Sequence, residues 1–366
     1  MKISIGSKIV EGPWGGGNLF AINLTNFLSK LGHDVIYDLS EPDIDLILLT
    51  DPRSRSESSS TFNHIEIKKY IKHINPKTVV VQRINECDER KNTTNINQFY
   101  LNASDVADHV VFVSEWLREI YIKCGMSEEK TSVIYAGANS EIFNSEGFHK
   151  FKNDEIIKIV THHWSSHANK GFKIYKKIDD LLVESEWRDK ISFTYIGNTS
   201  EDFIFNKTNI IKPLAGLELA KEIKKHHIYV TGSINEPSGN HHIEAAQCGL
   251  PVLYVESGGI PEYCNGIGLS FEEKNFEEKL KYLIDNYDEY AGKLSNYPFN
   301  SEKMCNEFYE LFNNLVNKNL NNDVTNGISI IGRYYLIKNR LSNRFRFFLS
   351  LRANLSSIIR KKLWTN

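Results

Sequence analysis

The stretch that most constrains this chain is residues 231–251, which read TGSINEPSGNHHIEAAQCGLP. A β-branched run at residues 226–233 leads into it and is typical of a buried strand. Residues 238–248 have the character of a short helix that Gly249 ends, and a new strand begins at residues 251–255. Strand, loop, helix and strand in this order predict a unit of an α/β fold, in which ligands bind at the carboxyl ends of strands.

The same stretch contains a pair of carboxylates, Glu236 in the loop and Glu244 in the helix, eight positions apart. Ser238, Gly239 and Asn240 lie at the expected helix N-terminus, where unpaired N–H groups and the positive end of the dipole suit a phosphate. Gly239 lets the backbone approach a ligand closely. A phosphate cradle between two carboxylates suits a nucleotide sugar, because its diphosphate needs donors and its hydroxyls need acceptors.

Length and composition set the frame for this unit. With 366 residues the chain exceeds one ordinary domain, and 41% hydrophobic and 25% charged residues are typical of a soluble globular protein. The net charge of −2 argues neither for nor against nucleic acid. Five cysteines without a C-x-x-C spacing favour reduced thiols over disulfides or zinc. The sequence shows no signal peptide and no transmembrane run, so we expect a cytoplasmic protein.

Several motifs now carry a family resemblance. E-P-S-G-N-H-H-I-E at 236–244 resembles the E-x7-E motif of retaining GT-B glycosyltransferases of family 4, and A-A-Q-C-G-L-P-V and G-G-I-P-E continue that pattern to residue 262. Weaker similarity extends over about 1–318. The resemblance implies two Rossmann-like, doubly wound domains that face a cleft: an acceptor-side domain at 1–150 and a nucleotide-sugar-binding domain at 151–318, followed by a basic amphipathic tail at 319–366.

The resemblance also assigns roles to individual residues. It implies that Glu244 holds the ribose hydroxyls and that Glu236 orients the sugar and supports a cation-like transition state. Lys170, in a Lys-Gly pair, would neutralise the donor diphosphate and the charge that grows on the leaving phosphate. Gly16 and Gly17 belong to the loop after the first strand, expected to end before a helix from residue 19, and their backbone would meet the donor phosphates.

Two departures from the family pattern stand out. The Arg that usually precedes the Lys by five positions is replaced by Ser165, with His163 and His167 as candidate substitutes. The N-domain loop after the expected strand 79–81 lacks the usual His and reads QRINECD at 82–88. Arg83, Asn85 and Asp88 are therefore the candidates on the acceptor side, and Asn85 joins Glu236 and Lys170 in the predicted catalytic set.

No metal or other cofactor is predicted, because Lys170 and the helix dipole would supply the positive charge. Asp43-Ile44-Asp45 spells the D-x-D signature of another glycosyltransferase fold, but it precedes the strand-like run LILLT. A structural role at the turn into that strand is the better interpretation. His241 and His242 have no other ligands at metal-site spacing, so we expect them to pack or to lie on the helix surface.

The tail has its own charge pattern. After Asp323 the chain carries nine Lys and Arg and no Asp or Glu, so residues 1–323 have a net charge of −11. Apolar residues from Tyr334 to Ile359 recur close to helical spacing. Basic and apolar faces together predict a helix on an anionic membrane, which would make the protein peripheral on the inner face of the membrane. Docking on the acidic body of the protein is the alternative; nucleic acid is not expected, since no binding motif accompanies the basic residues.

The predicted function is a retaining glycosyltransferase that moves a hexose-type sugar from a nucleotide-sugar donor to a glycan or lipid-linked acceptor. Two alternatives remain open at this point. One is a nucleotide-sugar epimerase on the same fold, and the other is a non-catalytic protein that binds a sugar nucleotide or a glycan.

Overall fold

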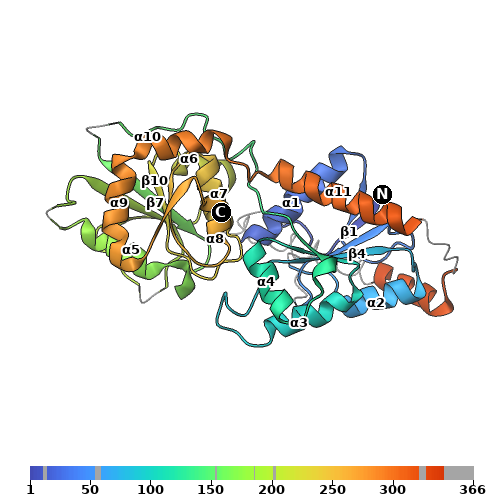
Figure 1. The fold of residues 1–366 in the computed structure, drawn as a ribbon. Coiled ribbons are helices and arrows are strands. Elements are labelled where there is room, and N and C mark those ends of the chain that lie inside the picture. Colours follow the sequence, from blue (N-terminus) through green and yellow to red (C-terminus); the bar gives the residue numbers. More distant parts are fainter. Residues whose placement is uncertain are drawn as a thin grey trace, which may run out of the picture.

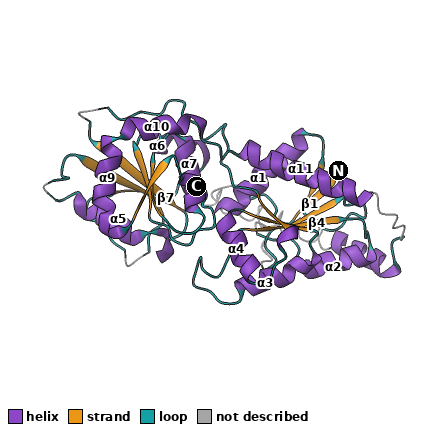
Figure 2. Ribbon diagram, in the orientation of Figure 1, coloured by secondary structure: helices purple, strands orange, loops and turns teal. Residues whose placement is uncertain are grey.

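The computed structural model describes residues 1–10, 15–53, 59–152, 155–184, 186–200, 203–320 and 327–341. The described chain forms two α/β domains, each built on a six-stranded sheet (Figure 1). All pairings between these strands are parallel, and each sheet lies between layers of helices (Figure 2). The predicted fold class, two Rossmann-like doubly wound domains, is confirmed.

The N-terminal domain has the strand order β2-β1-β3-β4-β5-β6. The order reverses at β1, which places the ligand-binding crevice of such a sheet at the carboxyl ends of β1 and β3. In chain order its elements are β1 (Lys2–Ile5), α1 (Gly15–Lys30), β2 (Asp34–Ile36), β3 (Leu46–Leu49), α2 (His64–His73), β4 (Val79–Ile84), α3 (Ile96–Ala103), η1 (Ser104–Val106), β5 (His109–Phe112), α4 (Glu115–Lys123), η2 (Glu128–Lys130) and β6 (Thr131–Val133).

The C-terminal domain has the order β12-β11-β10-β7-β8-β9 and reverses at β7. The loop after β10 therefore lies at the switch point, the usual ligand position. The elements are β7 (Ile157–His163), η3 (Ala168–Lys170), α5 (Phe172–Leu181), β8 (Ile191–Gly197), β9 (Asn209–Ile211), α6 (Gly216–Ile223), β10 (Ile228–Thr231), α7 (Asn240–Gln247), β11 (Val252–Val255), α8 (Ile260–Cys264), β12 (Gly268–Phe271), η4 (Glu273–Asn275), α9 (Phe276–Asp285), α10 (Tyr287–Lys293), η5 (Leu294–Asn296) and α11 (Ser301–Leu320).

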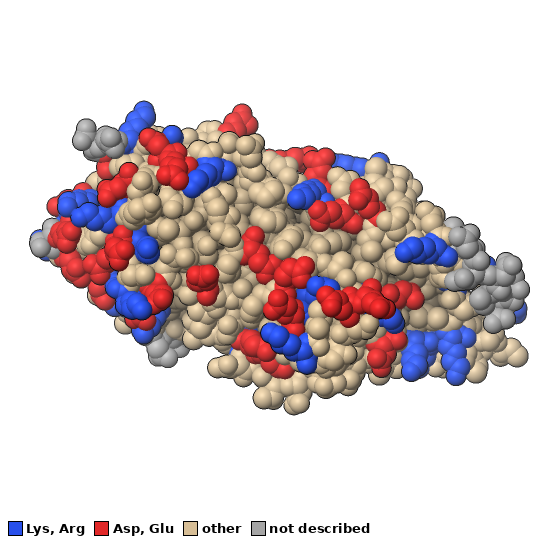
Figure 3. All heavy atoms as spheres, in the orientation of Figure 1, with Lys and Arg blue, Asp and Glu red and all other residues tan. Residues whose placement is uncertain are grey.

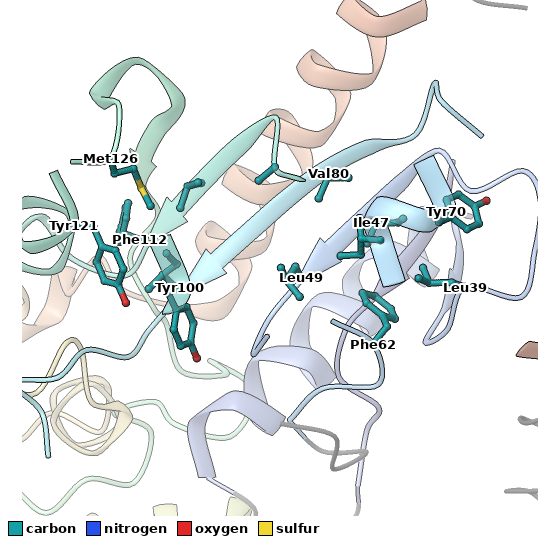
Figure 4. Close-up of a cluster of buried hydrophobic side chains, with 14 of the residues drawn as sticks. Leu39, Ile47, Leu49, Phe62, Tyr70, Val80, Tyr100, Phe112, Tyr121 and Met126 are labelled. Atoms are coloured by element: carbon teal, nitrogen blue, oxygen red, sulfur yellow. The ribbon is translucent and has the colours of Figure 1, made fainter. Parts of the chain in front are cut away.

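Hydrophobic side chains fill both faces of each sheet. On one face of the N-terminal sheet, α2, α3 and α4 pack through Tyr70, Tyr100 and Tyr121 against strand residues such as Val80 and Phe112 (Figure 4). All of these side chains are buried. Strands covered on both faces read as nearly continuous apolar runs, which is why β3 (LILL) could be recognised in the sequence.

The last long helix, α11, crosses from the C-terminal domain back to the N-terminal domain and lies beside α1 (Figure 1). Its residues Met304, Phe308 and Phe312 are buried in the N-terminal core with Phe20 and Leu24 of α1. The two domains are therefore joined twice, once through the linker after β6 and once through α11.

One boundary differs from the sequence-based expectation at α1. The helix begins at Gly15, whereas the glycines were expected to form a loop that ends before residue 19. The first amides of a helix lack intrahelical partners, so glycines cost less there than in a helix interior. Asn18 ties this turn to the chain after β1, because its side chain accepts a hydrogen bond from Val10 N (2.9 Å) and donates one to Val10 O (2.7 Å).

A second boundary differs at β4, which was expected to end at Val81 but continues through Gln82 and Arg83 to Ile84. Both polar side chains are buried. Gln82 Nε2 donates to Tyr100 O at 3.3 Å, and the Arg83 guanidinium lies 4.0 Å from the centre of the Phe20 ring. These partners let a strand include side chains that the sequence assigned to a polar loop.

The two aspartates of the D-x-D motif, Asp43 and Asp45, have the structural role that the sequence suggested. Lys2 Nζ contacts Asp43 Oδ1 at 2.7 Å, and Lys2 N donates to Asp45 Oδ2 at 2.7 Å. The two carboxylates thus fasten the start of β3 to β1.

Of the tail, residues 319–320 end α11 and residues 327–341 are described; its segments 321–326 and 342–366 lie outside the described residues. Residues 330–341 form a helix, here called the C-terminal helix, which docks on the N-terminal domain beside α2 (Figure 1). Leu336 is buried in the N-terminal core, Ser329 N donates to His73 O at 3.1 Å, and Arg340 Nε donates to Ser40 O at 3.1 Å. This part of the tail follows the alternative of docking on the protein itself. Among the described helices, none is long and apolar enough to span a bilayer.

Candidate active site

The candidate site is centred on the loop between β10 and α7. Gly239 precedes α7 with φ +84°, and a Cβ at this position would lie 2.8 Å from His241 Cε1 and 3.1 Å from Glu236 Cγ. Only glycine therefore lets the chain turn here so close to Glu236. Ser238, Gly239 and Asn240 lie at the N-terminus of α7, as predicted; phosphate binding by their amides stays a prediction.

We expect Gly239→Ala to destabilise this turn. A side chain at φ +84° costs about 1–2 kcal/mol, and the contact with His241 adds to that cost. The variant should lower the urea midpoint of unfolding and weaken nucleotide binding. Gly147→Ala is the matched control, because Gly147 has φ +72° but nothing within 4 Å of an added Cβ. Equal effects of both variants would mean that the close contact at Gly239 has no role.

Glu236 is held between cations of both domains. Its Oε1 forms an ion pair with Arg90 Nη2 of the N-terminal domain at 3.1 Å, and its Oε2 contacts Lys170 Nζ of the C-terminal domain. The side chain is only 7% exposed. Burial alone would raise the pKa of this carboxyl, but the charges of Lys170 and Arg90 outweigh burial and lower the pKa to about 2. Glu236 is therefore ionised at any ordinary pH.

This low pKa predicts an acid-dependent loss of stability. In the unfolded chain the Glu236 carboxyl takes up its proton near its ordinary pKa of 4.5, whereas the folded protein keeps it ionised down to about 2. The stabilisation, on the order of 3 kcal/mol at most, is fully present above pH 4.5 and is lost as the pH falls towards 2. Urea unfolding should show Glu236→Gln well below wild type at pH 7 and close to it at pH 2.5. A pH-independent gap between the two would contradict this prediction.

Lys170 ends the short η3 turn, and Gly171 follows it with φ +93°. A Cβ at Gly171 would lie 2.4 Å from Gly232, so the Lys-Gly turn packs directly on the start of the loop that contains Glu236. The Lys170 side chain is 14% exposed. The structure thus brings together Lys170 and Glu236, which the sequence placed in the catalytic set on separate grounds.

The second carboxylate of the motif, Glu244, is buried in α7, where its Oε2 lies 2.8 Å from His162 Nε2 at the end of β7. The sequence did not single out His162, which lies 82 residues away. This contact fixes one carboxylate oxygen of Glu244. The predicted role of Glu244 at the ribose hydroxyls stays a prediction.

The first turn of α1 lies against the first turn of α7 across the domain boundary. A Cβ at Gly16 would lie 3.3 Å from Asn240 Oδ1, whereas one at Gly17 would meet nothing within 4 Å. Both glycines are exposed. The two helix N-termini thus face the same region, and their unpaired N–H groups and positive dipole ends make that region favourable for an anion.

The three acceptor-side candidates have different surroundings. Arg83 is buried, and within the described chain no carboxylate pairs with it; burial lowers its pKa to about 10. Asn85 is partly exposed in the loop directly after β4. Asp88 accepts from Ile96 N at 2.9 Å and from Asn97 N at 3.0 Å, and so caps the N-terminus of α3. Asp88 thus has a structural task that the sequence did not reveal.

Arg90 is the functional candidate that the sequence did not single out. It sits in the charged run DERK, which is typical of a solvated loop, but Arg90 links Glu236 to Glu86, with 3.3 Å between Arg90 Nη1 and Glu86 Oε2. Two amides of the C-terminal domain also bind this loop: Asn169 Nδ2 donates to Arg90 O (2.9 Å), and Asn235 Nδ2 donates to Glu89 O (3.1 Å). Arg90, rather than His163 or His167, is the second cation beside Glu236.

The G-G-I-P-E stretch forms a second bridge between the domains. Glu262 caps α4 of the other domain, because it accepts from Glu115 N at 2.7 Å and from Trp116 N at 2.8 Å. Gly259 makes this approach possible: a Cβ there would lie 2.7 Å from Ser114 Cβ. Gly259 N also donates to Glu236 O at 2.9 Å, so the same loop supports the Glu236 backbone.

We expect Glu262→Gln to loosen the interface between the domains. The change replaces charge-assisted hydrogen bonds to a helix N-terminus by weaker ones and should lower the free energy of unfolding by about 1–3 kcal/mol. Urea unfolding would measure the effect. Glu302→Gln is the control, because Glu302 is an exposed carboxylate in the first turn of α11. If both variants lose the same stability, the interdomain cap is not what Glu262 contributes.

Buried imidazoles pack beneath the site. The rings of His163 and His241 lie 4.6 Å apart, and those of His241 and His242 lie 4.9 Å apart. Burial lowers the pKa of all three, to about 3 for His242, so they are neutral near pH 7. Of the two positions expected for His241 and His242, packing or the helix surface, the structure shows buried packing.

One group of described residues has the spacing of metal ligands, but it lies at the opposite, amino edge of the C-terminal sheet: His149, Glu155 and His227. His227 Nδ1 accepts from Lys158 N at 3.1 Å, and burial lowers the pKa of this ring to about 4. The neutral ring therefore carries its proton on Nε2, the atom that faces Glu155. A protonated Nε2 is not a metal ligand, so this group makes a poor metal site.

Comparison with known proteins bears on this site. Residues 203–299, which include the Glu236 loop, α7 and the G-G-I-P-E stretch, match the family described as glycosyl transferases group 1. The gpi3 subunit of phosphatidylinositol N-acetylglucosaminyltransferase from Schizosaccharomyces pombe (strain 972 / ATCC 24843) is 22% identical over 208 residues. The alignment covers 53% of this chain, which spans only 44% of the length of that relative.

Solved structures resemble nearly the whole described fold. Anabaena Alr3699/HepE in complex with UDP has a TM-score of 0.64 at 14% identity, covering 86% of this chain and 100% of that chain. A glycosyltransferase from Rickettsia africae ESF-5 has a TM-score of 0.63 at 14% identity, covering 86% and 98%. The lipopolysaccharide outer core galactosyltransferase WaaB gives 0.60 at 14% identity, covering 87% and 99%.

The paired parallel domains, with a site at the carboxyl edges of both sheets, define the GT-B fold. The matched family segment contains the loop that positions Glu236 and the helix that positions Glu244. Fold and segment together support a glycosyltransferase.

Proposed function

We propose that this chain is a retaining glycosyltransferase that moves a hexose-type sugar from a nucleotide-sugar donor to a glycan or lipid-linked acceptor. The observation that carries the proposal is the Glu236 carboxylate, buried at the N-terminus of α7 and paired with Lys170 and Arg90 from the two domains. A carboxylate kept ionised between two cations suits a reaction in which a sugar becomes cation-like while a phosphate departs as an anion.

In this proposal the donor binds along α7. The amides of Ser238, Gly239 and Asn240 and those of Gly16 and Gly17 receive the diphosphate, and Glu244 accepts from the ribose hydroxyls. A uridine nucleotide is the first donor to test, because one of the similar structures holds UDP and glucose. Residues 211–214, which follow β9, would pack on the base.

The chemistry follows from where the charges lie. Glu236 orients the sugar and supports positive charge on it, while Lys170 and Arg90 stabilise negative charge on the leaving phosphate. Fixed charges in a water-poor site are worth several kcal/mol of barrier, because they need no reorganisation during the reaction. The leaving phosphate takes the proton of the acceptor hydroxyl on the face that it vacates, which retains the anomeric configuration. We assign no metal to this reaction.

The acceptor would approach from the N-terminal domain. Arg83 and Asn85 lie at and just beyond the carboxyl end of β4, on the edge of the sheet that faces the other domain. A buried guanidinium without a carboxylate partner suits an acceptor with an anionic or strongly polar group. Asp88 is the weaker of the three candidates, because both of its carboxylate oxygens accept hydrogen bonds in the cap of α3.

The test is a thermal-shift screen of UDP-, GDP-, ADP- and TDP-sugars with and without EDTA, followed by chromatography of the bound donor in the presence of acceptors. A shift with one nucleotide that EDTA leaves unchanged, together with acceptor-dependent release of the nucleoside diphosphate, is the expected result. Donor conversion without an acceptor would favour the epimerase. Binding without turnover over a broad acceptor set would favour the non-catalytic binding protein.

A further inference from the structure

The C-terminal helix has an apolar face on the outside of the molecule. Ile330, Tyr334, Ile337 and Leu341 are 87%, 63%, 58% and 60% exposed. At 100° per residue these four positions fall in a stripe about 60° wide. A helix that packs on a core ordinarily turns polar residues to the solvent, so a second apolar stripe on the outer side needs its own explanation.

The inner side of the same helix is already occupied. Leu336 is buried in the N-terminal core, Gly332 lies so close to α2 that a Cβ would be 2.1 Å from His73 O, and Asn339 Nδ2 donates to Leu39 O at 3.2 Å. These three positions lie roughly opposite the stripe on the helix. The helix is therefore fixed in one orientation, and the stripe stays outside.

Basic residues border the stripe on both sides. At 100° per residue, Lys338 falls on one side and Arg333 on the other, about 60–80° from the stripe's centre, and both are exposed. The neighbouring α2 adds the exposed Lys68 and Lys72. On the face drawn in Figure 3, Lys and Arg side chains gather at this end of the N-terminal domain.

We propose that this stripe and its basic borders form a docking surface for an anionic lipid bilayer. The apolar side chains would enter the level between headgroups and acyl chains, and Arg333 and Lys338 would meet lipid phosphates. Tyr334 combines an apolar ring with a polar hydroxyl, which suits that level. The proposal rests on this helix and stands independently of the proposed glycosyl transfer.

Charge and position favour a bilayer over the other occupants. The stripe is apolar apart from the Tyr334 hydroxyl, whereas its borders are cationic. Residues 342–366, which follow Leu341 in the sequence, contain six Lys and Arg but no Asp or Glu. An anionic sheet with an apolar interior matches both features at once.

The experiment is vesicle flotation with the full chain. Wild-type protein should float with vesicles of phosphatidylcholine and phosphatidylglycerol and should stay behind with phosphatidylcholine alone. The double variant Ile330→Ser, Ile337→Ser should lower the equilibrium constant for vesicle binding roughly tenfold or more, because two side chains no longer enter the apolar layer. Ile204→Ser with Leu217→Ser is the matched control: these side chains are 73% and 58% exposed on the C-terminal domain, and the control should bind like wild type.

A second pair of variants tests the charges. Arg333→Gln with Lys338→Gln should weaken binding to the anionic vesicles, whereas Lys207→Gln with Lys281→Gln, both exposed on the C-terminal domain, should not. Circular dichroism and donor-induced thermal shifts check that all variants fold and keep the cleft.

Three results would overturn the proposal. The first is wild-type protein that ignores anionic vesicles or binds neutral ones equally well. The second is a stripe variant that floats as well as wild type. The third is a wild-type dimer in light scattering without lipid that becomes a monomer in the stripe variant, since a second copy of the chain would then cover the stripe.

Discussion

Replacing Glu236 by Gln is expected to lower the rate of sugar transfer by about 10²–10³-fold while the protein stays folded. Gln keeps the size of the side chain but removes the negative charge that faces Lys170 and Arg90. Support for the cation-like sugar is lost, whereas the cations that receive the diphosphate remain. Transfer is measured as initial rates of nucleoside diphosphate release with the donor that the thermal-shift screen identifies.

The outcome separates a chemical role from a binding role. Affinity for the nucleoside diphosphate should be unchanged or stronger in Glu236→Gln, because the carboxylate that competes for Lys170 is neutralised. Glu256→Gln, at an exposed position after β11, is the control and should transfer like wild type. Wild-type turnover by Glu236→Gln would contradict the catalytic role assigned to Glu236 and with it the proposed mechanism.

Lys170→Met is expected to impair both binding and transfer. The loss of a charge-assisted contact should weaken nucleoside diphosphate binding by about 10–100-fold. The rate of transfer should fall further, by about 10²–10³-fold in total, since the charge on the leaving phosphate grows during the reaction. Calorimetry with the nucleoside diphosphate and the release assay measure the two effects on the same preparation.

Lys173→Met is the matched control for this variant. Lys173 lies three residues further on, in α5, with a side chain that is 78% exposed, and it pairs with Glu273 away from the cleft. A Lys170 variant that binds the diphosphate as wild type does, but transfers slowly, would assign Lys170 to the chemistry alone. A variant with normal binding and normal transfer would exclude Lys170 from the site.

The fold could be predicted from the sequence because helices and strands leave local patterns of apolar and polar residues. Buried parallel strands have continuous apolar runs, as in β3, which the sequence showed as the run LILLT. The two boundaries that were predicted wrongly, the start of α1 and the end of β4, lie where the residue types are unusual for the element that they form. Three glycines suggested a loop but form the first turn of α1, and Gln82 and Arg83 suggested a loop but lie inside β4.

Only part of the candidate active site could be predicted from the sequence, for a related reason. Glu236 and Glu244 belong to one short motif, so sequence spacing alone could pair them. Arg90 and His162 gain their importance from partners 146 and 82 residues away. A local pattern cannot report such contacts, because they depend on how the two domains meet, and neither residue lies in a run that distinguishes it from a surface loop or a buried strand.

The ion pairs around Arg90 have a consequence for how any anion enters the cleft. Within the part of the chain that the structure describes, they connect four cations with three carboxylates across both domains: Arg53, Arg90, Lys91 and Lys170 with Asp51, Glu86 and Glu236. This network holds one positive charge in excess, inside a chain whose net charge is −2. Lys170 already has a counter-ion of its own in Glu236. An incoming diphosphate must therefore displace the Glu236 carboxylate from Lys170. Donor binding is then an exchange of counter-ions. Its affinity depends on how much more strongly Lys170 binds the diphosphate than it binds Glu236.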